Sequence, residues 1–303
     1  MIVRPRPHWL RLLFVRRGSL VHKIFTQQCL MFAWSAAIIY AHAHLQHWQI
    51  SLTAAPFSLM GLALAIFLGF RINASYDRYW EARKHWGAVL VEVRNLARQA
   101  QTLTSTASQP RPFILGLAGF AAAMRNQLRS EASDHGCRHL LPESLLAQMQ
   151  GKRFAPVLVL RWLGEWLRDE REAGRLDPVL APKMEASLDA LSMAHGSCER
   201  IAYNPLPFSY AVILHRAAYL FCLLLPFGLV ESVGLMTPLV VTFVSYTFFA
   251  LEALSDEIEE PFGRSTNDLA LDAMVVTIEI SLRELLGETP PAALQPDCNY
   301  LLT

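Results

Sequence analysis

The side chains that most often do chemistry in proteins are scattered along this chain and form no familiar motif. Five cysteines lie far apart without CxxC spacing, so the sequence predicts neither a disulfide framework nor a zinc site. Two histidine clusters, 42–47 and 135–139, lack carboxylates or thiols at the spacing of known metal motifs, and we interpret both as exposed loops. No phosphate-binding glycine loop, nucleophile elbow, HExxH pair or catalytic triad is present, so we expect no enzyme activity and neither a cofactor nor a metal.

One cluster of carboxylates stands out. It contains no intervening lysine or arginine and consists of Glu252, Asp256, Glu257, Glu259 and Glu260. Like-signed charges of this kind set up a field that can attract cations. The alternative is that these acids neutralise the arginines that follow an earlier apolar segment, which would leave little net field.

The composition indicates whether the chain folds in water or in a membrane. Of 303 residues, 53% are hydrophobic and only 17% are charged, and the mean hydropathy is positive. An ordinary soluble domain has about a quarter of its residues charged, so we predict a polytopic membrane protein. Lysine and arginine nearly balance aspartate and glutamate, 27 against 26, which argues against nucleic acid as a partner.

Four apolar segments are long enough to cross a bilayer, at residues 24–45, 52–70, 208–230 and 233–251. His215 and Arg216 interrupt the third, and Pro226 is expected to bend it. Neither hairpin loop contains a lysine or arginine, whereas basic residues precede the first span and follow the second. By the positive-inside rule, both termini are cytoplasmic. The basic residues before the first span are Arg4, Arg6, Arg11, Arg16, Arg17 and Lys23.

The remainder has a helical, amphipathic pattern, and we predict a cytoplasmic helical body from residues 71–207 and 252–287. Prolines mark the expected helix ends. Pro110 and Pro112 are expected to close the helix that continues from the second span, and Pro142 to open another. Asp177 and Pro178 resemble an N-cap followed by proline at the first helical position. Residues 1–287 would form one unit, followed by a loose, peripheral, proline-rich tail at 288–303.

The second span carries two neighbouring ridges of residues four apart. One is small, with Gly61, Ala65 and Gly69, and would let helices approach closely. The other is bulky and apolar, with Leu62, Ile66 and Phe70. The bulky ridge could face lipid or pack in a bundle. Alternatively, several copies of the helix could surround an axis, with this ridge pointing inward as a hydrophobic constriction.

Residues 70–87, FRINASYDRYWEARKHWG, resemble the signature of the bestrophin family of ion channels, in its bacterial branch. The similarity extends over roughly residues 10–285. Two weaker motifs agree with it: 174–179, GRLDPV, resembles the family's cytoplasmic constriction, and 260–263, EPFG, resembles the stretch after the last span. The charged residues of the signature, Asp77, Arg78, Glu81 and Arg83, have spacings suited to ion pairs with each other and with adjacent helices.

The resemblance implies an all-α membrane protein with four transmembrane helices per subunit and a helical cytoplasmic body, assembling as a homopentamer around one central pore in the bacterial inner membrane. It implies a neck at Leu62, Ile66 and Phe70, the ridge that periodicity singled out, and a cytoplasmic aperture at Val179. Animal members conduct anions, and the bacterial branch conducts cations. Ile66 stands where the animal proteins carry phenylalanine, whose positive ring edge favours anions. We therefore expect permeating monovalent cations.

One departure concerns calcium. After Pro-Phe-Gly the animal members have a nearly continuous acidic run that binds calcium, whereas this chain has Arg264, Ser265, Thr266, Asn267 and Asp268. One carboxylate does not supply the six to eight oxygens that calcium takes. Calcium activation in the animal manner is therefore not expected. The alternative functions are an anion channel of the animal type and a non-conducting membrane scaffold or regulatory subunit that binds a partner protein.

Overall fold

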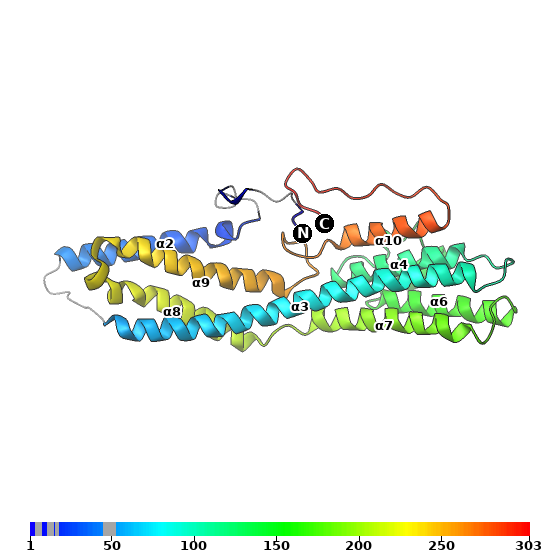
Figure 1. The fold of residues 1–303 in the computed structure, drawn as a ribbon, viewed down its shortest axis with the longest axis horizontal. Helices are drawn as coiled ribbons and strands as arrows, with labels where there is room; N and C mark the ends of the chain where they lie inside the picture. Colours follow the sequence, from blue (N-terminus) through cyan, green and yellow to red (C-terminus); the bar gives the residue numbers. More distant parts are fainter. Residues whose placement is uncertain (4–7, 11–14, 16–17, 45–52) are drawn as a thin grey trace. The chain divides into compact units, whose positions relative to one another are not determined.

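A computed structural model describes residues 1–3, 8–10, 15, 18–44 and 53–303. The arginines of the N-terminal basic run and the first hairpin loop, with His47, lie outside the described residues. The described part is all-α, as predicted, and carries no named strand, only isolated bridges between Ile2 and Leu301 and between Thr104 and Leu176. Figure 1 follows the helices in chain order. They are α2 Val21–His44, α3 Ala54–Thr102, α4 Arg111–Leu128, α5 Glu143–Met149, α6 Ala155–Glu172, α7 Ala181–Tyr203, α8 Phe208–Val233, η1 Gly234–Met236, α9 Thr237–Glu259 and α10 Leu271–Leu285.

The chain divides into two compact units. The membrane unit comprises Pro5–Tyr79 and Pro205–Glu259, and the body comprises Met1–Arg4, Trp80–Asn204 and Glu260–Thr303. Helix α3 contributes its apolar N-terminal part to the membrane unit and its charged C-terminal part to the body. The second span and the signature after it therefore belong to one continuous helix of 49 residues.

The membrane unit contains α2, α8, α9 and the first part of α3. Three stretches are long and apolar enough to cross a membrane, namely Val21–His44, Ala55–Thr102 and Phe208–Glu259. The last of these holds both α8 and α9, which are separated by η1, so the four predicted spans fall on four helices. Gly234 makes the break with φ 58°, a left-handed conformation that glycine adopts without steric cost.

The core of the membrane unit lies where these helices pack together. Helix α2 packs on α8 and α9, and α8 packs on α9. Leu64 and Leu68 of α3 join the same apolar cluster as Leu214 and Phe221 of α8 and Phe249 of α9. These five side chains are each at most 5% exposed, so the core is dry and tightly packed.

The body is organised around α4, in which the 15 consecutive residues from Phe113 to Gln127 are all buried. Helices α6, α7 and α10 pack against it. Gly116 permits the close approach of α6, since a Cβ there would lie 2.4 Å from Trp162, and Gly119 makes room for Leu141, which precedes α5 and would lie 2.4 Å from such a Cβ. A helix that is apolar all round must be buried on every face, as α4 is.

The predicted proline breaks were only partly right. Pro142 is the N-cap of α5, as expected. Pro110 and Pro112 do not close the long helix, because α3 ends at Thr102; they are the N-cap and a first-turn residue of α4. Proline is also favoured in the first turn of a helix, where its missing N–H would have no intrahelical partner. These two prolines therefore start α4 rather than end α3.

The tail is irregular, as expected, but it is not loose at its end. The backbone N–H of Ala273 in α10 donates to the carbonyl of Thr303, and Val3 donates to Tyr300. Leu302 donates to the carbonyl of Met1 in the same way. Backbone hydrogen bonds therefore hold the tail against α10 and the N-terminal residues.

Candidate ion pathway

The described part of the chain covers the bulky ridge of α3 only in part. Leu62, Ile66 and Phe70 are 60%, 49% and 60% exposed, whereas Leu64 and Leu68 on the same helix are buried. Residues two apart on a helix point to nearly opposite sides, so burial of one set turns the other set outward. The interpretation of the ridge as core of its own bundle is therefore wrong, and its partner is lipid, another copy or a pore.

The small ridge is used differently from our expectation at one end. A Cβ on Gly61 would lie 3.2 Å from the ring of Phe221, so this glycine packs against α8 of the same chain. Gly69 has nothing within 4 Å of such a Cβ, and Ala65 is exposed. Only the part of the row nearer the body is left open for close contact with a neighbouring helix.

Val179 is presented outward by a tightly held turn. The Asp177 carboxylate accepts a hydrogen bond of 2.8 Å from the backbone N–H of Val179. The Asp177 carbonyl accepts from Leu180 and Ala181, so the turn leads directly into α7. Regular helix begins only at Ala181, four residues after the predicted cap, because Leu180 takes the N-cap position and a second proline, Pro182, enters the first turn. Val179 is 83% exposed at this turn.

The segment just before this turn is fixed by Glu170 of α6. Its carbonyl accepts hydrogen bonds from the N–H groups of Arg175 and Leu176, and its carboxylate accepts two from the Arg175 guanidinium, at 2.8 and 2.9 Å. The hydrogen bond from Arg175 lowers the pKa of the Glu170 carboxyl below its ordinary value. Gly174 turns the chain with φ 68°. The position of Val179 therefore follows from a network that includes a doubly bonded ion pair.

Three of the four charged signature residues, Arg78, Glu81 and Arg83, have architectural contacts, and the expected ion pair with an adjacent helix is seen at Glu81. The Arg78 Nε donates to the carbonyl of Glu259 at 3.4 Å, and Glu81 pairs with Arg200 of α7. The Arg83 guanidinium lies 5.8 Å from the centroid of the Trp80 ring. These contacts are of the kind that fix helices rather than bind permeating ions.

The carboxylate cluster is partly neutralised. Arg71 pairs with both Asp256 and Glu259, Lys23 pairs with Glu257 at 3.4 Å, and the His215 Nδ1 lies 2.7 Å from Glu252. Glu260 is exposed. Among the described residues, the two permanent cations Arg71 and Lys23 pair with Asp256, Glu259 and Glu257. The alternative of neutralisation by neighbouring basic groups thus describes part of the cluster.

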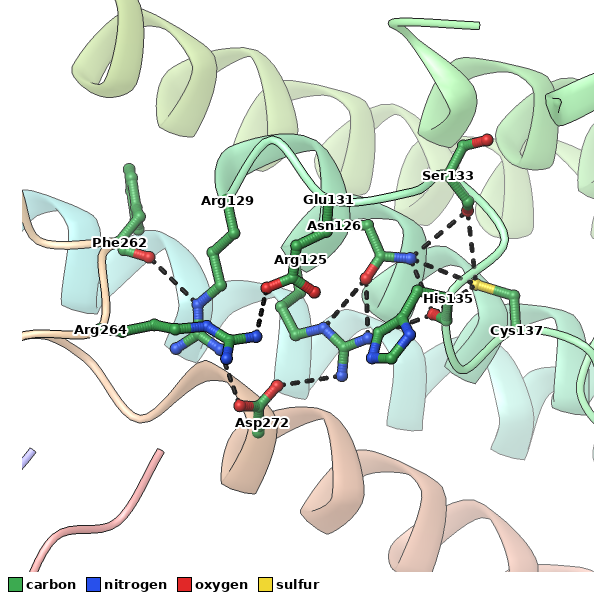
Figure 2. A network of polar contacts seen from close by, with 10 residues as sticks. All are labelled: Arg125, Asn126, Arg129, Glu131, Ser133, His135, Cys137, Phe262, Arg264 and Asp272. Carbon is green, nitrogen blue, oxygen red and sulfur yellow. Dashed lines mark hydrogen bonds and ion pairs between the residues drawn. The ribbon is translucent and has the colours of Figure 1, made fainter. Parts of the chain in front are cut away.

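A second polar network joins α4 to α10 and to the segment after the last span (Figure 2). The Asp272 carboxylate of α10 forms ion pairs with Arg125 at 3.1 Å and with Arg129 at 2.7 Å. Both arginine side chains are at most 9% exposed. Arg129 also donates to the carbonyl of Phe262 at 3.2 Å. Burial alone would raise the pKa of the Asp272 carboxyl, but the hydrogen bond and charge of Arg129, with the charge of Arg125, lower it.

The basic residue of the segment 264–268, Arg264, belongs to the same network. Arg264 pairs with Glu131, as Figure 2 shows, and Gly263 lets Asp268 come close, since a Cβ there would lie 2.5 Å from its carboxylate. Sequence reasoning missed the whole network. Its members are separated by as many as 143 residues, so no local spacing could have revealed them.

The second histidine cluster is taken up by structural contacts. His139 pairs with Glu279 at 3.1 Å, and Cys137 is buried, with desolvation raising the pKa of its thiol to about 11. Among the described residues no three histidine, cysteine or acidic side chains come together in a way that could hold a metal ion. A metal also prefers a thiolate, which this burial disfavours.

Comparisons with known proteins agree over nearly the whole chain. The profile of the bacterial and fungal bestrophin protein family matches residues 1–284. A voltage-dependent anion channel-forming protein of Ralstonia nicotianae is 45% identical over 291 residues, which cover 95% of each chain. The voltage-dependent anion channel-forming protein YneE of Escherichia coli K12 is 42% identical over 304 residues, which cover 100% of both chains. A crystal structure of a bacterial bestrophin homologue from Klebsiella pneumoniae superimposes with a TM-score of 0.85 at 40% identity, covering 88% of this chain and 100% of that one.

Proposed function

The chain belongs to the bacterial and fungal bestrophin family and is therefore a membrane ion channel, and on this premise we propose a homopentamer that conducts monovalent cations through one central pore. Residues 1–287 form the conducting unit in this proposal. The single observation that carries it is that the positions which the family resemblance assigns to the neck, Leu62, Ile66 and Phe70, form one apolar ridge of α3 that the single chain leaves about half or more exposed.

We place the neck at this ridge. Five inward copies of Leu62, Ile66 and Phe70 would make three stacked apolar rings spanning about 12 Å. A constriction of this type conducts only when it is wetted, so narrowing and apolarity together control the current.

Single-channel recording in planar bilayers tests the neck. Ile66→Ala is expected to raise the conductance or the open probability, because it widens the middle ring. Leu64→Ala, two residues away and buried in the core, is the matched control and is expected to leave the conductance unchanged. An Ile66→Ala channel that stays pentameric with unaltered current contradicts the neck assignment.

The aperture is assigned to Val179. Its exposure and the fixed turn that presents it support an inward-facing position in an assembly. Val179→Cys in a variant lacking the native thiols is expected to react with a charged thiol reagent added from the cytoplasmic side, and the reaction should reduce the current. Met193→Cys, on the exposed part of α7, provides the control for modification away from the axis. A Val179→Cys variant that does not react, or that reacts without effect on the current, argues against the aperture.

Cation preference rests on the residual negative charge of the carboxylate cluster and on the aliphatic Ile66 at the middle of the ridge. The neck has no charge of its own, so selection falls to the field of the vestibules, which fivefold copies would focus on the axis. The second candidate is an anion channel, because the Ralstonia and Escherichia relatives carry names of anion channel-forming proteins.

The reversal potential under a KCl gradient separates these candidates. A value near the potassium equilibrium potential supports cation conduction, and a value near that of chloride supports the second candidate. Glu260→Gln removes an exposed member of the cluster and is expected to shift the potential toward zero, while Glu143→Gln at the start of α5 leaves it unchanged. Purified protein that seals tightly and passes no ions would contradict conduction itself and favour a scaffold.

The membrane orientation belongs to the same proposal. Basic residues precede α2 and follow the apolar part of α3, and neither hairpin carries one, so we place both termini and the body in the cytoplasm of a bacterial inner membrane. Labelling of Cys298, which is exposed in the tail, by an impermeant thiol reagent should occur in lysed cells and not in intact spheroplasts. Equal labelling of both would reverse the orientation.

A further inference from the structure

One cation of the membrane unit has no partner in the described part of the chain. Arg216 of α8 is exposed and makes neither a hydrogen bond nor an ion pair there, whereas Lys23 pairs with Glu257, Arg71 with Asp256, and Arg78 bonds to a backbone carbonyl. A guanidinium in or beside a bilayer is costly to leave unpaired, so its partner is expected to lie outside this chain.

The surroundings of Arg216 are apolar and face away from the core. The core side of α8 carries Leu214, Ala218, Phe221 and Leu225, all buried. Residues two apart on a helix point to nearly opposite sides, so Arg216 lies on the face opposite Leu214. Along that outer face Arg216 is flanked by exposed apolar side chains one and two turns away, namely Ile213, Leu220 and Leu223.

The depth of Arg216 is fixed by its neighbour. The His215 Nδ1 lies 2.7 Å from the carboxylate of Glu252, which is the first acid after the apolar run 233–251 of α9. The third turn of α8, which contains Arg216, is therefore level with the end of an apolar span, where acyl chains give way to headgroups.

We propose that Arg216 binds the phosphate of an anionic phospholipid whose acyl chains lie along Leu220 and Leu223. The planar guanidinium can donate two parallel hydrogen bonds to phosphate oxygens, and the apolar stripe accommodates the chain below. The site depends on the membrane placement of α8 and not on the neck, the pentamer or the ion selectivity, so it can fail or hold independently of them.

Native mass spectrometry of the purified full chain tests this site. Delipidated protein is titrated with phosphatidylglycerol or with zwitterionic phosphatidylcholine, and the lipid-bound fraction is measured. Wild-type protein should prefer phosphatidylglycerol, and Arg216→Gln should weaken its binding about fivefold, the effect of one cation near an anionic surface. Lys23→Gln, which removes an ion-paired cation from the same unit, is the matched control and should retain the preference.

Two further readouts keep the test decisive. Arg216→Lys keeps the charge but loses the paired hydrogen bonds, so its binding should fall between wild type and Arg216→Gln. Unchanged phosphatidylglycerol binding in Arg216→Gln, or an equal loss in Lys23→Gln, overturns the proposal. A loss of assembly mass in Arg216→Gln with lipid binding intact also overturns it, because the partner is then a carboxylate of a second copy.

Discussion

The two units of this chain differ in how many large apolar side chains they leave exposed. The membrane unit has an apolar core, but it also exposes large apolar side chains, with Leu59 72% and Phe243 69% exposed, while Ser35, Ser75 and Ser245 are fully buried. In the body the largest apolar side chains are inside, among them Trp86, Phe113 and Phe120. This difference indicates that lipid surrounds one unit and water the other. Packing in lipid gains little from hiding apolar surface and depends more on close fit and polar contacts.

Two equivalent substitutions, one in each unit, test this difference. Leu163 in α6 of the body is fully buried, and Leu68 in the membrane unit is 3% exposed. Leu163→Ala should lower the free energy of unfolding by about 4 kcal/mol, from lost transfer energy and a cavity. Leu68→Ala should cost about 2 kcal/mol, because lipid tails are as apolar as the core and only the cavity remains. Reversible unfolding in mixed micelles measures both, and equal losses would contradict the distinction.

The body also depends on buried charge. Asp272→Asn leaves two buried guanidinium groups without their carboxylate, so we expect a loss of about 3 kcal/mol in the stability of the body. The thermal unfolding midpoint followed by circular dichroism should fall by several degrees. Arg138→Gln breaks an exposed pair with Asp134 and should change the stability by no more than about 0.5 kcal/mol. A small effect in both variants would mean that the network is not required for stability.

A smaller effect is expected from acid. The pKa of Asp272 lies below its ordinary value in the folded chain, so the ionised form stabilises the fold. This contribution is fully present above the ordinary pKa of an aspartate, about 3.9, and is lost as the pH falls through the lower folded value. Titration of Asp272 should therefore cause no change in the unfolding midpoint between pH 7 and pH 5, and Asp272→Asn should show a shallower decline below pH 4. A parallel decline in both proteins would contradict the assignment.

The smallest effect on stability is expected at the ridge. Ile66 is half exposed within one chain, so Ile66→Ala removes few contacts of the folded subunit and should cost less than about 1 kcal/mol. The same micelle unfolding measures it, with Leu68→Ala on the adjacent turn as the reference. A loss as large as that of Leu68→Ala would place Ile66 in a packed interface rather than along a pore.

Contiguous stretches of sequence determined the spans, the all-α class and the ridge of Leu62, Ile66 and Phe70. Hydropathy over 20 residues and a repeat of four are properties of neighbouring residues, and a helix converts them directly into a membrane segment and a face. The family signature at residues 70–87 is local in the same way. The site residues themselves stay predictions, because a pore forms between copies and one sequence specifies only its share of the wall.

Only the tertiary structure decided which charges meet. The contacts of Asp272 with Arg125 and Arg129, of Arg71 with Asp256, and of Arg264 with Glu131 join residues more than 100 apart, whose pairing depends on how helices pack. The structure also decided where α7 begins. Asp177 caps a turn next to Pro178, but the helix itself begins at Ala181, next to Pro182. Local patterns specify which side chains a helix exposes, and packing alone specifies what they touch, because a contact needs both partners in place.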